Sequence, residues 1–226
     1  MINSTCNPVT SKIAKSKHDL ERIAKLRYQV YIEEQGKPYS EADHTNKSFG
    51  DVLDQEATLV MLEKQNTLVG TMRLNYLSTS FAYTQYYDFF ELRKFPDIPL
   101  KTIGVCSRLA VSANHRNGVV REALFSAIYK EGYLGGYAVC FAACTPILFR
   151  LFKAYGFREY TTSYIDPVVG TLKRLLLIVD DIEHLKVVNS PFYTIAMELN
   201  VQPRFNKKLF EQIFLDFRME NEAHNT

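Results

Sequence analysis

Four carboxylates lie close together in one polar segment of the sequence, residues 37–55. They are Glu41, Asp43, Asp51 and Asp54. A polar segment between apolar stretches predicts a loop, which is either a solvated connection or a loop that folds over a substrate. In the second case its carboxylates would help to hold a polar molecule and to keep the loop ordered.

A second stretch of chemical interest runs from Lys101 to Tyr133. An apolar, β-branched run predicts a strand, residues 112–117 predict a polar turn, and a helix with one apolar face follows. A strand that enters a helix through such a turn directs backbone N–H groups and the positive end of the helix dipole at one point. The stretch therefore predicts an anion site, although any strand–turn–helix unit shares this pattern.

Two cysteines, Cys140 and Cys144, have a spacing that a metal pair can use. No His or second Cys pair completes a ligand set, so we expect buried strand thiols and no metal site. We also see no Ser-His-Asp or Cys-His arrangement for nucleophilic catalysis.

The composition indicates a folded globular protein, because 226 residues with 46% hydrophobic side chains can bury a sizeable core. A formal net charge of +2 gives no reason to expect nucleic acid as a partner. The N-terminus lacks the apolar core of a signal peptide, and no run of about 18 apolar residues predicts a membrane span. Four cysteines fit a reduced protein, so we expect a cytoplasmic location.

Hydrophobic periodicity and turn residues predict the order of helices and strands. We expect strands at 11–16, 57–63, 67–76, 103–111, 137–144, 157–164 and 171–179, and helices at 17–35, 82–93, after the 112–117 turn, and at 146–155, 182–187 and 205–219. The three residues between the second and third strands have the length and polarity of a hairpin turn.

This order of elements resembles the GNAT acyltransferase superfamily. The segment LFRLFKAYGFREY, with Gly156 and Phe157, is similar to the GNAT segment that closes with Gly-Phe. The resemblance implies an α/β (α+β) GNAT fold, in which helices flank a central mixed twisted sheet. Residues 1–180 would form this domain, and residues 181–226 would be a C-terminal helical extension packed on it.

At more specific positions the sequence resembles one branch of the superfamily, which comprises the acyl-homoserine-lactone autoinducer synthases and the long-chain N-acyl amino acid synthases. The matching positions are Arg27 and Tyr31 in LRYQVYIEEQG, Asp51 and Asp54 in GDVLDQEA, Arg73 in LVGTMRL, and Ser107 and Arg108 in CSRLAV. The resemblance implies catalytic roles for Arg73, Ser107 and Arg108. It implies that Arg27, Tyr31, Asp51 and Asp54 bind the acceptor of the acyl group.

The charged members of this set would form an alternating cluster if the first helix and the acidic loop close over the sheet. Such a cluster would hold a polar acceptor and order the loop. The alternative is a purely structural salt-bridge network, since buried ion pairs often do no more than fix geometry.

The predicted acyl-donor site departs from the pattern of coenzyme A-dependent relatives. Those relatives usually have a glycine-rich loop that binds the pyrophosphate. The similar segment here, HRNGVVREA, has bulky residues at positions where small ones would let the backbone approach a phosphate. This departure favours an acyl carrier protein thioester over coenzyme A as co-substrate, with no tightly bound cofactor. The donor-binding candidates are Leu109, Val111, Arg116, Gly118, Val119 and Val120.

A basic surface for an acidic carrier protein would come from Arg116, Arg121, Arg150, Lys153 and Arg158. The alternative is that these side chains belong to solvated helix faces.

A second departure concerns proton transfer. Synthases of this branch carry a Glu two residues before the Ser-Arg pair, suited to act as general base, and that position here is Val105. The Tyr that protonates the leaving thiolate in many GNAT enzymes is similarly replaced by Phe152, and Tyr155 lies three residues later. A water chain or a neighbouring carboxylate would have to serve instead.

Three hypotheses follow for function. The first is an N-acyltransferase that moves a long-chain acyl group from acyl carrier protein, or less favourably coenzyme A, to the amine of an amino acid or peptide side chain. The apolar side chains of Phe81, Phe89, Phe90 and Phe141 would house the acyl chain. The second is a catalytically silent GNAT scaffold that binds an acyl group, a carrier protein or another protein. The third, a small-acyl coenzyme A-dependent acetyltransferase, is disfavoured by the poor phosphate loop.

Overall fold

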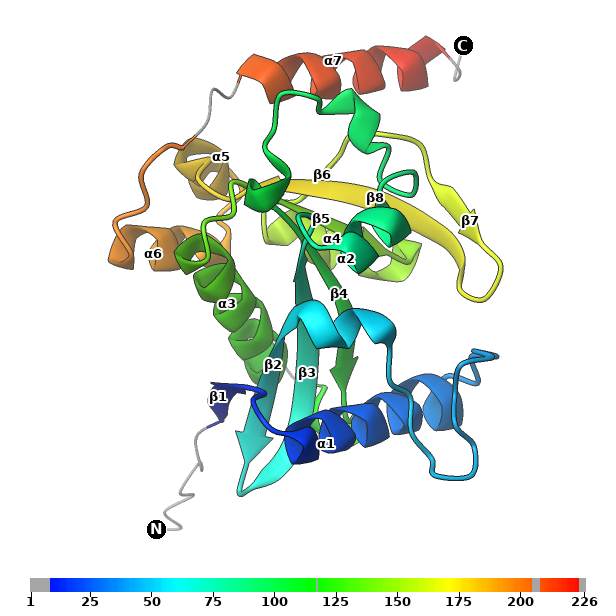
Figure 1. Ribbon diagram of the computed structural model, residues 1–226. Coiled ribbons are helices and arrows are strands. Elements are labelled where there is room, and N and C mark those ends of the chain that lie inside the picture. Colours follow the sequence, from blue (N-terminus) through cyan, green and yellow to red (C-terminus); the bar gives the residue numbers. More distant parts are fainter. Residues whose placement is uncertain (1–8, 117, 205–207, 224–226) are drawn as a thin grey trace. The chain divides into compact units, whose positions relative to one another are not determined.

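The computed structural model describes residues 9–116, 118–204 and 208–223, and Figure 1 shows its helices and strands. The strands are β1 (Thr10–Ile13), β2 (Ala57–Lys64), β3 (Thr67–Tyr76), β4 (Ile103–Val111), β5 (Val139–Cys144), β6 (Arg158–Glu159), β7 (Tyr164–Asp166) and β8 (Gly170–Ile178). Hydrogen bonding gives the order β1-β2-β3-β4-β5-β8-β6, and β7 also pairs with β8. The sheet is mixed, since β4 and β5 run parallel while β5 and β8 run antiparallel.

The helices are α1 (Lys17–Arg27), α2 (Ser80–Tyr86), α3 (Gly118–Leu134), α4 (Pro146–Ala154), α5 (Ile182–Val187), α6 (Pro191–Glu198) and α7 (Lys208–Ala223). Shorter helical segments are the π-helix η1 (Tyr28–Glu34) and the 3₁₀ turns η2 (Val52–Glu56), η3 (Leu92–Lys94), η4 (Leu100–Thr102) and η5 (Ala113–His115). The structure therefore confirms the predicted fold class, in which helices flank a mixed sheet.

The chain forms two compact units. The first unit comprises Met1–Leu74 and Ser107–Ile128, and the second comprises Asn75–Cys106 and Tyr129–Thr226. These units do not correspond to the predicted division at residue 180 between an acyltransferase domain and a C-terminal extension. That division stays a prediction.

In the first unit, local sequence signals define α1 and the β2–β3 hairpin. Ser16 caps α1, because its side chain accepts from the Asp19 N–H and the Asp19 carboxylate accepts in return from the Ser16 N–H. Gln65 and Asn66 both have positive φ, the geometry of a two-residue hairpin turn. Ile23 then packs on Leu59 and Met61 of β2.

The predicted helix over residues 17–35 is confirmed in extent, but its second half winds as a π-helix. Leu26 and Val30 pack together on Ala110, while Tyr28 packs with Ala42 and Phe49. A π turn places side chains differently from an α turn and is found often at functional sites. Sequence periodicity missed it because the apolar spacing fits both windings.

The second unit has an aromatic core. Phe90, Phe95, Phe141 and Tyr160 are all buried, and the rings of Phe90 and Phe141 lie 5.3 Å apart. Tyr160 also donates its hydroxyl hydrogen to the Phe90 carbonyl at 2.8 Å. These contacts tie the segment after α2 to the sheet.

Several predicted elements of the second unit differ from the structure. The single strand expected at 157–164 is two short strands, β6 and β7, because the Thr162 carbonyl between them accepts from Arg174 Nε at 3.0 Å. Strands β7 and β8 pair antiparallel on either side of the 166–170 turn. Helix α5 has its predicted bounds, α6 was not predicted, and α7 begins at Lys208. Phe205, where that helix was expected to begin, lies outside the described residues.

Candidate active site

Five charged side chains of the first unit form a chain of ion pairs, in which two arginines are buried and the other three residues are half-buried. Arg27 Nη1 lies 2.6 Å from Asp54 Oδ2, and Asp54 Oδ1 lies 3.2 Å from Arg73 Nη1. The same Arg73 nitrogen lies 2.9 Å from Asp51 Oδ2, which lies 2.7 Å from Arg108 Nη2. The order along the chain is therefore Arg27, Asp54, Arg73, Asp51, Arg108, with alternating charges. We call these five residues the charge cluster.

The elements of the first unit position each member of the cluster. Arg27 is the last residue of α1, Arg73 lies on β3 and Arg108 on β4. Asp51 caps η2, because its Oδ1 accepts from the Leu53 N–H at 2.9 Å, and Asp54 lies within that same turn. The acidic loop is thus anchored at its end by a backbone cap as well as by arginines.

Arg108 is held in an unusual conformation. Its φ of +54° places it in the left-handed region, which costs a residue other than glycine free energy. Its guanidinium carbon lies 4.8 Å from the centre of the Phe49 ring and 5.4 Å from that of Tyr39. The two rings stack at 4.7 Å, so the aromatic pair and Asp51 together fix the direction of this side chain.

Arg27 is buried with only part of its hydrogen-bonding capacity used. Its side chain is 1% exposed, and Nε and Nη2 have no hydrogen-bond partner among the described residues. Leaving a buried donor unpaired costs about 1–3 kcal/mol. The guanidinium therefore retains two donors that a ligand could satisfy.

The cluster has a net positive charge of one, from three guanidinium groups and two carboxylates. Burial by itself would raise the pKa of Asp51, but Arg73 and Arg108 outweigh it and hold that pKa below its ordinary value. For Arg27 burial prevails over the attraction of Asp54 and lowers the pKa of the guanidinium. Asp51 is therefore ionised at neutral pH, and the site favours an anionic group.

Two uncharged residues adjoin the cluster. Arg73 Nε donates to Ser107 Oγ at 3.1 Å, so the arginine and the serine of neighbouring strands act as one unit. The Tyr31 hydroxyl donates to the Leu109 carbonyl at 2.8 Å, and burial raises the pKa of that hydroxyl. Tyr31 is therefore protonated and fixed.

A model of the FeeM N-acyl amino acid synthases matches residues 22–179 of the sequence. The chain belongs to this family. No curated protein matches its sequence. Among solved structures, FeeM from uncultured soil microbes is 13% identical, with a TM-score of 0.64 over 83% of this chain and 98% of that one.

Two AHL synthases show the same fold. LasI is 12% identical, with a TM-score of 0.62 over 76% of this chain and 91% of that one. BjaI, described as CoA-dependent and solved with SAM and isopentyl-CoA, is 17% identical, with a TM-score of 0.60 over 81% of this chain and 90% of that one. The GNAT fold predicted from the sequence is confirmed. The N-acyl amino acid synthase family makes this chain an N-acyltransferase, which favours the first hypothesis over a silent scaffold.

The predicted donor-binding residues lie where β4 leads into α3. Leu109 and Val111 are half-buried on β4, Val119 is 65% exposed, and Val120 is buried under β3, close to Gly70. A Cβ on Gly118 would meet only the tip of Arg121. Arg116 pairs with Glu34 and donates through Nε to the Val111 carbonyl at 3.1 Å. Its guanidinium therefore holds the turn together.

The predicted basic surface is only partly available. Arg158 in the second unit is half-buried and pairs with Asp181 at 2.9 Å, so it does not belong to a solvated landing surface. Arg150 and Lys153 are exposed on α4, together with Ile147, which is 87% exposed. A basic helix face with an exposed aliphatic side chain remains.

The two positions at which the sequence lacks the general base and the general acid of its relatives both lie in the core of the second unit. Val105 is 1% exposed on β4, and Phe152 is buried against Phe157 at a ring distance of 5.2 Å. Neither position carries an acid or base. Tyr155, the other candidate acid, is also buried and packs on Phe192.

The structure also locates the two cysteines that have the spacing of a metal pair. Cys140 and Cys144 are buried on β5. Among the described residues, no group of three or more His, Cys, Asp or Glu side chains is arranged to hold a metal ion. Within the same ranges, no helix is long and apolar enough to cross a membrane.

Tyr39 and Phe49 are the residues of the site that sequence reasoning missed. They lie in a polar loop where no periodicity marks them. A large aromatic residue just before the acidic pair was the available signal, since an exposed loop has little use for one.

Proposed function

We propose that this N-acyltransferase moves a long-chain acyl group from an acyl carrier protein thioester to the amine of an amino acid. A peptide side chain is the other acceptor to be tested. The acceptor nitrogen attacks the thioester carbonyl, the C–N bond forms and the C–S bond breaks. The carrier thiol leaves with one proton and a second proton is released, without an acyl-enzyme.

The observation that carries this proposal is the pair of unpartnered donors on Arg27. Two N–H groups of one guanidinium match the two oxygens of a carboxylate, and the net positive charge of the cluster favours an anion there. An amino acid supplies that carboxylate. In this proposal Arg27, Tyr31, Asp51 and Asp54 bind and orient the acceptor.

Arg73, Ser107 and Arg108 are proposed as the catalytic group. Negative charge develops on the thioester oxygen during attack, and prearranged donors lower the energy of that state. Arg73 Nε donates to the Ser107 hydroxyl oxygen, so Ser107 is held beside the positive charges that Arg73 and Arg108 supply.

The donor is proposed to lie along the end of β4 and the start of α3, at Leu109, Val111, Arg116, Gly118, Val119 and Val120. The exposed Arg150 and Lys153 of α4, with Ile147 beside them, fit an acidic carrier protein that also offers apolar contacts. BjaI is described as CoA-dependent, so coenzyme A is the alternative donor to compare. We further propose that residues 1–180 are the acyltransferase domain, that 181–226 extend it, and that the protein is cytoplasmic.

Intact-mass analysis tests the donor and the acceptor together. The protein is incubated with palmitoyl-loaded carrier protein or palmitoyl-CoA and a pool of the twenty amino acids. The expected result is one N-palmitoyl amino acid, formed with an equal loss of acyl group from the carrier protein. Transfer from palmitoyl-CoA alone would overturn the choice of carrier protein, and absence of any acylated amino acid would overturn the choice of acceptor.

A further inference from the structure

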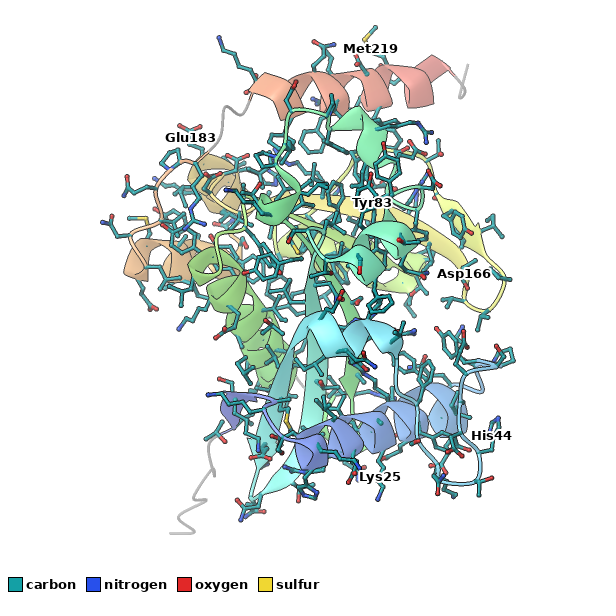
Figure 2. All side chains as sticks on the ribbon, viewed as in Figure 1. Lys25, His44, Tyr83, Asp166, Glu183 and Met219 are labelled. Carbon is teal, nitrogen blue, oxygen red and sulfur yellow. The ribbon has the colours of Figure 1, made fainter. Side chains whose placement is uncertain are left out.

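A cavity lies in the second unit, lined by residues of α5, α7, β6 and β8. It has a volume of about 250 Å³ and opens to solvent. Its apolar lining comprises the buried Ile178, Phe210 and Phe214 and the exposed Val187. Glu183 of α5, labelled in Figure 2, and Glu211 of α7 are exposed at its edge. Nothing in the proposed acyl transfer uses this cavity.

Arg158 lines the cavity and has a hydrogen-bond donor without a partner among the described residues. Its guanidinium carbon lies 4.3 Å from the centre of the Phe214 ring, and Nη2 donates to Asp181 Oδ2 at 2.9 Å. Its Nε is buried and has no hydrogen-bond partner among the described residues. A buried N–H of this kind is stabilised by an acceptor oxygen.

His184 supplies an acceptor to the same cavity. Its Nε2 lies 3.1 Å from the Gly156 carbonyl oxygen, which can only accept, so Nε2 carries the hydrogen. Burial, and then the charge of Arg158, lower the pKa of His184, so the ring is neutral at pH 7. The other ring nitrogen, Nδ1, is therefore an acceptor that suits a ligand N–H.

The charges around the cavity are mostly negative. Arg158 is balanced by Asp181, whereas Glu183 and Glu211 add two carboxylates at the edge. A ligand that fits these groups needs an acceptor oxygen for Arg158, a cationic N–H group for Glu211 and His184, and an apolar part for the phenylalanine wall. A free amino acid has all three, and those with larger apolar side chains match the volume.

We propose that this cavity is a binding site for a free α-amino acid with an apolar or aromatic side chain. The carboxylate accepts from Arg158 Nε, the ammonium group lies between Glu211 and His184 Nδ1, and the side chain packs on Phe210 and Phe214. This site is separate from the acceptor site proposed at Arg27.

Isothermal titration calorimetry of the full chain tests the proposal. Each of the twenty amino acids is titrated into the Arg27→Met protein, so that binding at the proposed acceptor site does not contribute. We expect saturable binding of about one apolar amino acid per chain. N-acetylation of that amino acid, which removes the ammonium charge, should weaken binding at least tenfold. Absence of saturable binding by any amino acid would overturn the proposal.

Matched variants on α7 locate the binding. Glu211→Gln should weaken binding at least fivefold, whereas Glu222→Gln, an exposed residue near the end of the same helix, should leave it unchanged. Both changes are on the surface and should keep the fold, which circular dichroism checks. Equal affinity of the two variants would overturn the site. Because the titration does not depend on acyl transfer, failure of the proposed function leaves this result interpretable.

Discussion

Removing Arg27 should change the stability of the protein much less than removing its partner Asp54, if Arg27 is held ready for a ligand. In Arg27→Met the side chain keeps its approximate length, and two unpartnered buried donors disappear along with the charge. Asp54 keeps Arg73 as a partner at 3.2 Å. In Asp54→Asn the buried Arg27 loses the one carboxylate bonded to it, and the net charge of the cluster rises from one to two.

The magnitudes differ enough to measure. Each unpartnered donor costs about 1–3 kcal/mol, which offsets the ion pair lost in Arg27→Met. We therefore expect its free energy of unfolding to stay within about 1 kcal/mol of the wild type. Asp54→Asn leaves the buried charge of Arg27 without its carboxylate, which should reduce the free energy of unfolding by about 3 kcal/mol. For a chain of this size that difference lowers the melting temperature by roughly 6–12 °C.

Thermal and urea unfolding measure stability, and initial rates of acyl transfer measure function. Arg27→Met should keep its stability but raise the KM for the amino acid, by roughly 100- to 10,000-fold if two charge-assisted hydrogen bonds are lost. If Arg27→Met is destabilised as much as Asp54→Asn, then Arg27 is a structural partner and the reasoning from its free donors is wrong.

Three further predictions concern the described parts of both units. Because the folded pKa of Asp51 is depressed, its ionised form stabilises the fold above about pH 4, and this contribution is lost as pH falls toward the folded pKa. Asp51→Asn should therefore flatten the loss of melting temperature between pH 5 and 3, and parallel curves would contradict this. Ser16→Ala should cost about 1 kcal/mol in urea unfolding, because the α1 cap is lost; an unchanged midpoint would contradict it. Gly156→Ala should cost about 1–3 kcal/mol, since φ is +99° and the new Cβ would lie 2.6 Å from Leu185. Gly136 has a similar φ, but a Cβ there would meet no other atom. Gly136→Ala therefore measures the backbone strain without the steric overlap, and it should reduce the free energy of unfolding less than Gly156→Ala does.

The predictable part of the fold is the part that local physics controls. Turn residues at Gln65 and Asn66, the Ser16 cap and the apolar strand runs depend on neighbours in sequence, and these elements were placed correctly. The break between β6 and β7 was not predictable, because it depends on Arg174 reaching a carbonyl twelve residues away. The π winding of η1 was missed because the apolar spacing fits both an α-helix and a π-helix.

For the candidate site, the sequence by itself determined the residue types and the family. The resemblance of the arginine and aspartate positions to those of autoinducer and N-acyl amino acid synthases implied an N-acyltransferase, and the family match over residues 22–179 confirmed it. The sequence could not say which donors are already used, because charge alone does not reveal partners. Only the tertiary structure shows that Asp51 and Asp54 both contact Nη1 of Arg73, while two donors of Arg27 have no partner among the described residues.

The structure also decided the use of residues that looked equivalent in sequence. Arg150 of α4 and Arg158, which follows that helix, are both basic, yet one is exposed and the other is half-buried beside Asp181 and Phe214. Residue type sets what a side chain can bind, and the sequence determines that directly. Which groups surround it, and therefore what remains free to bind, depends on contacts between distant segments that form only in the folded chain.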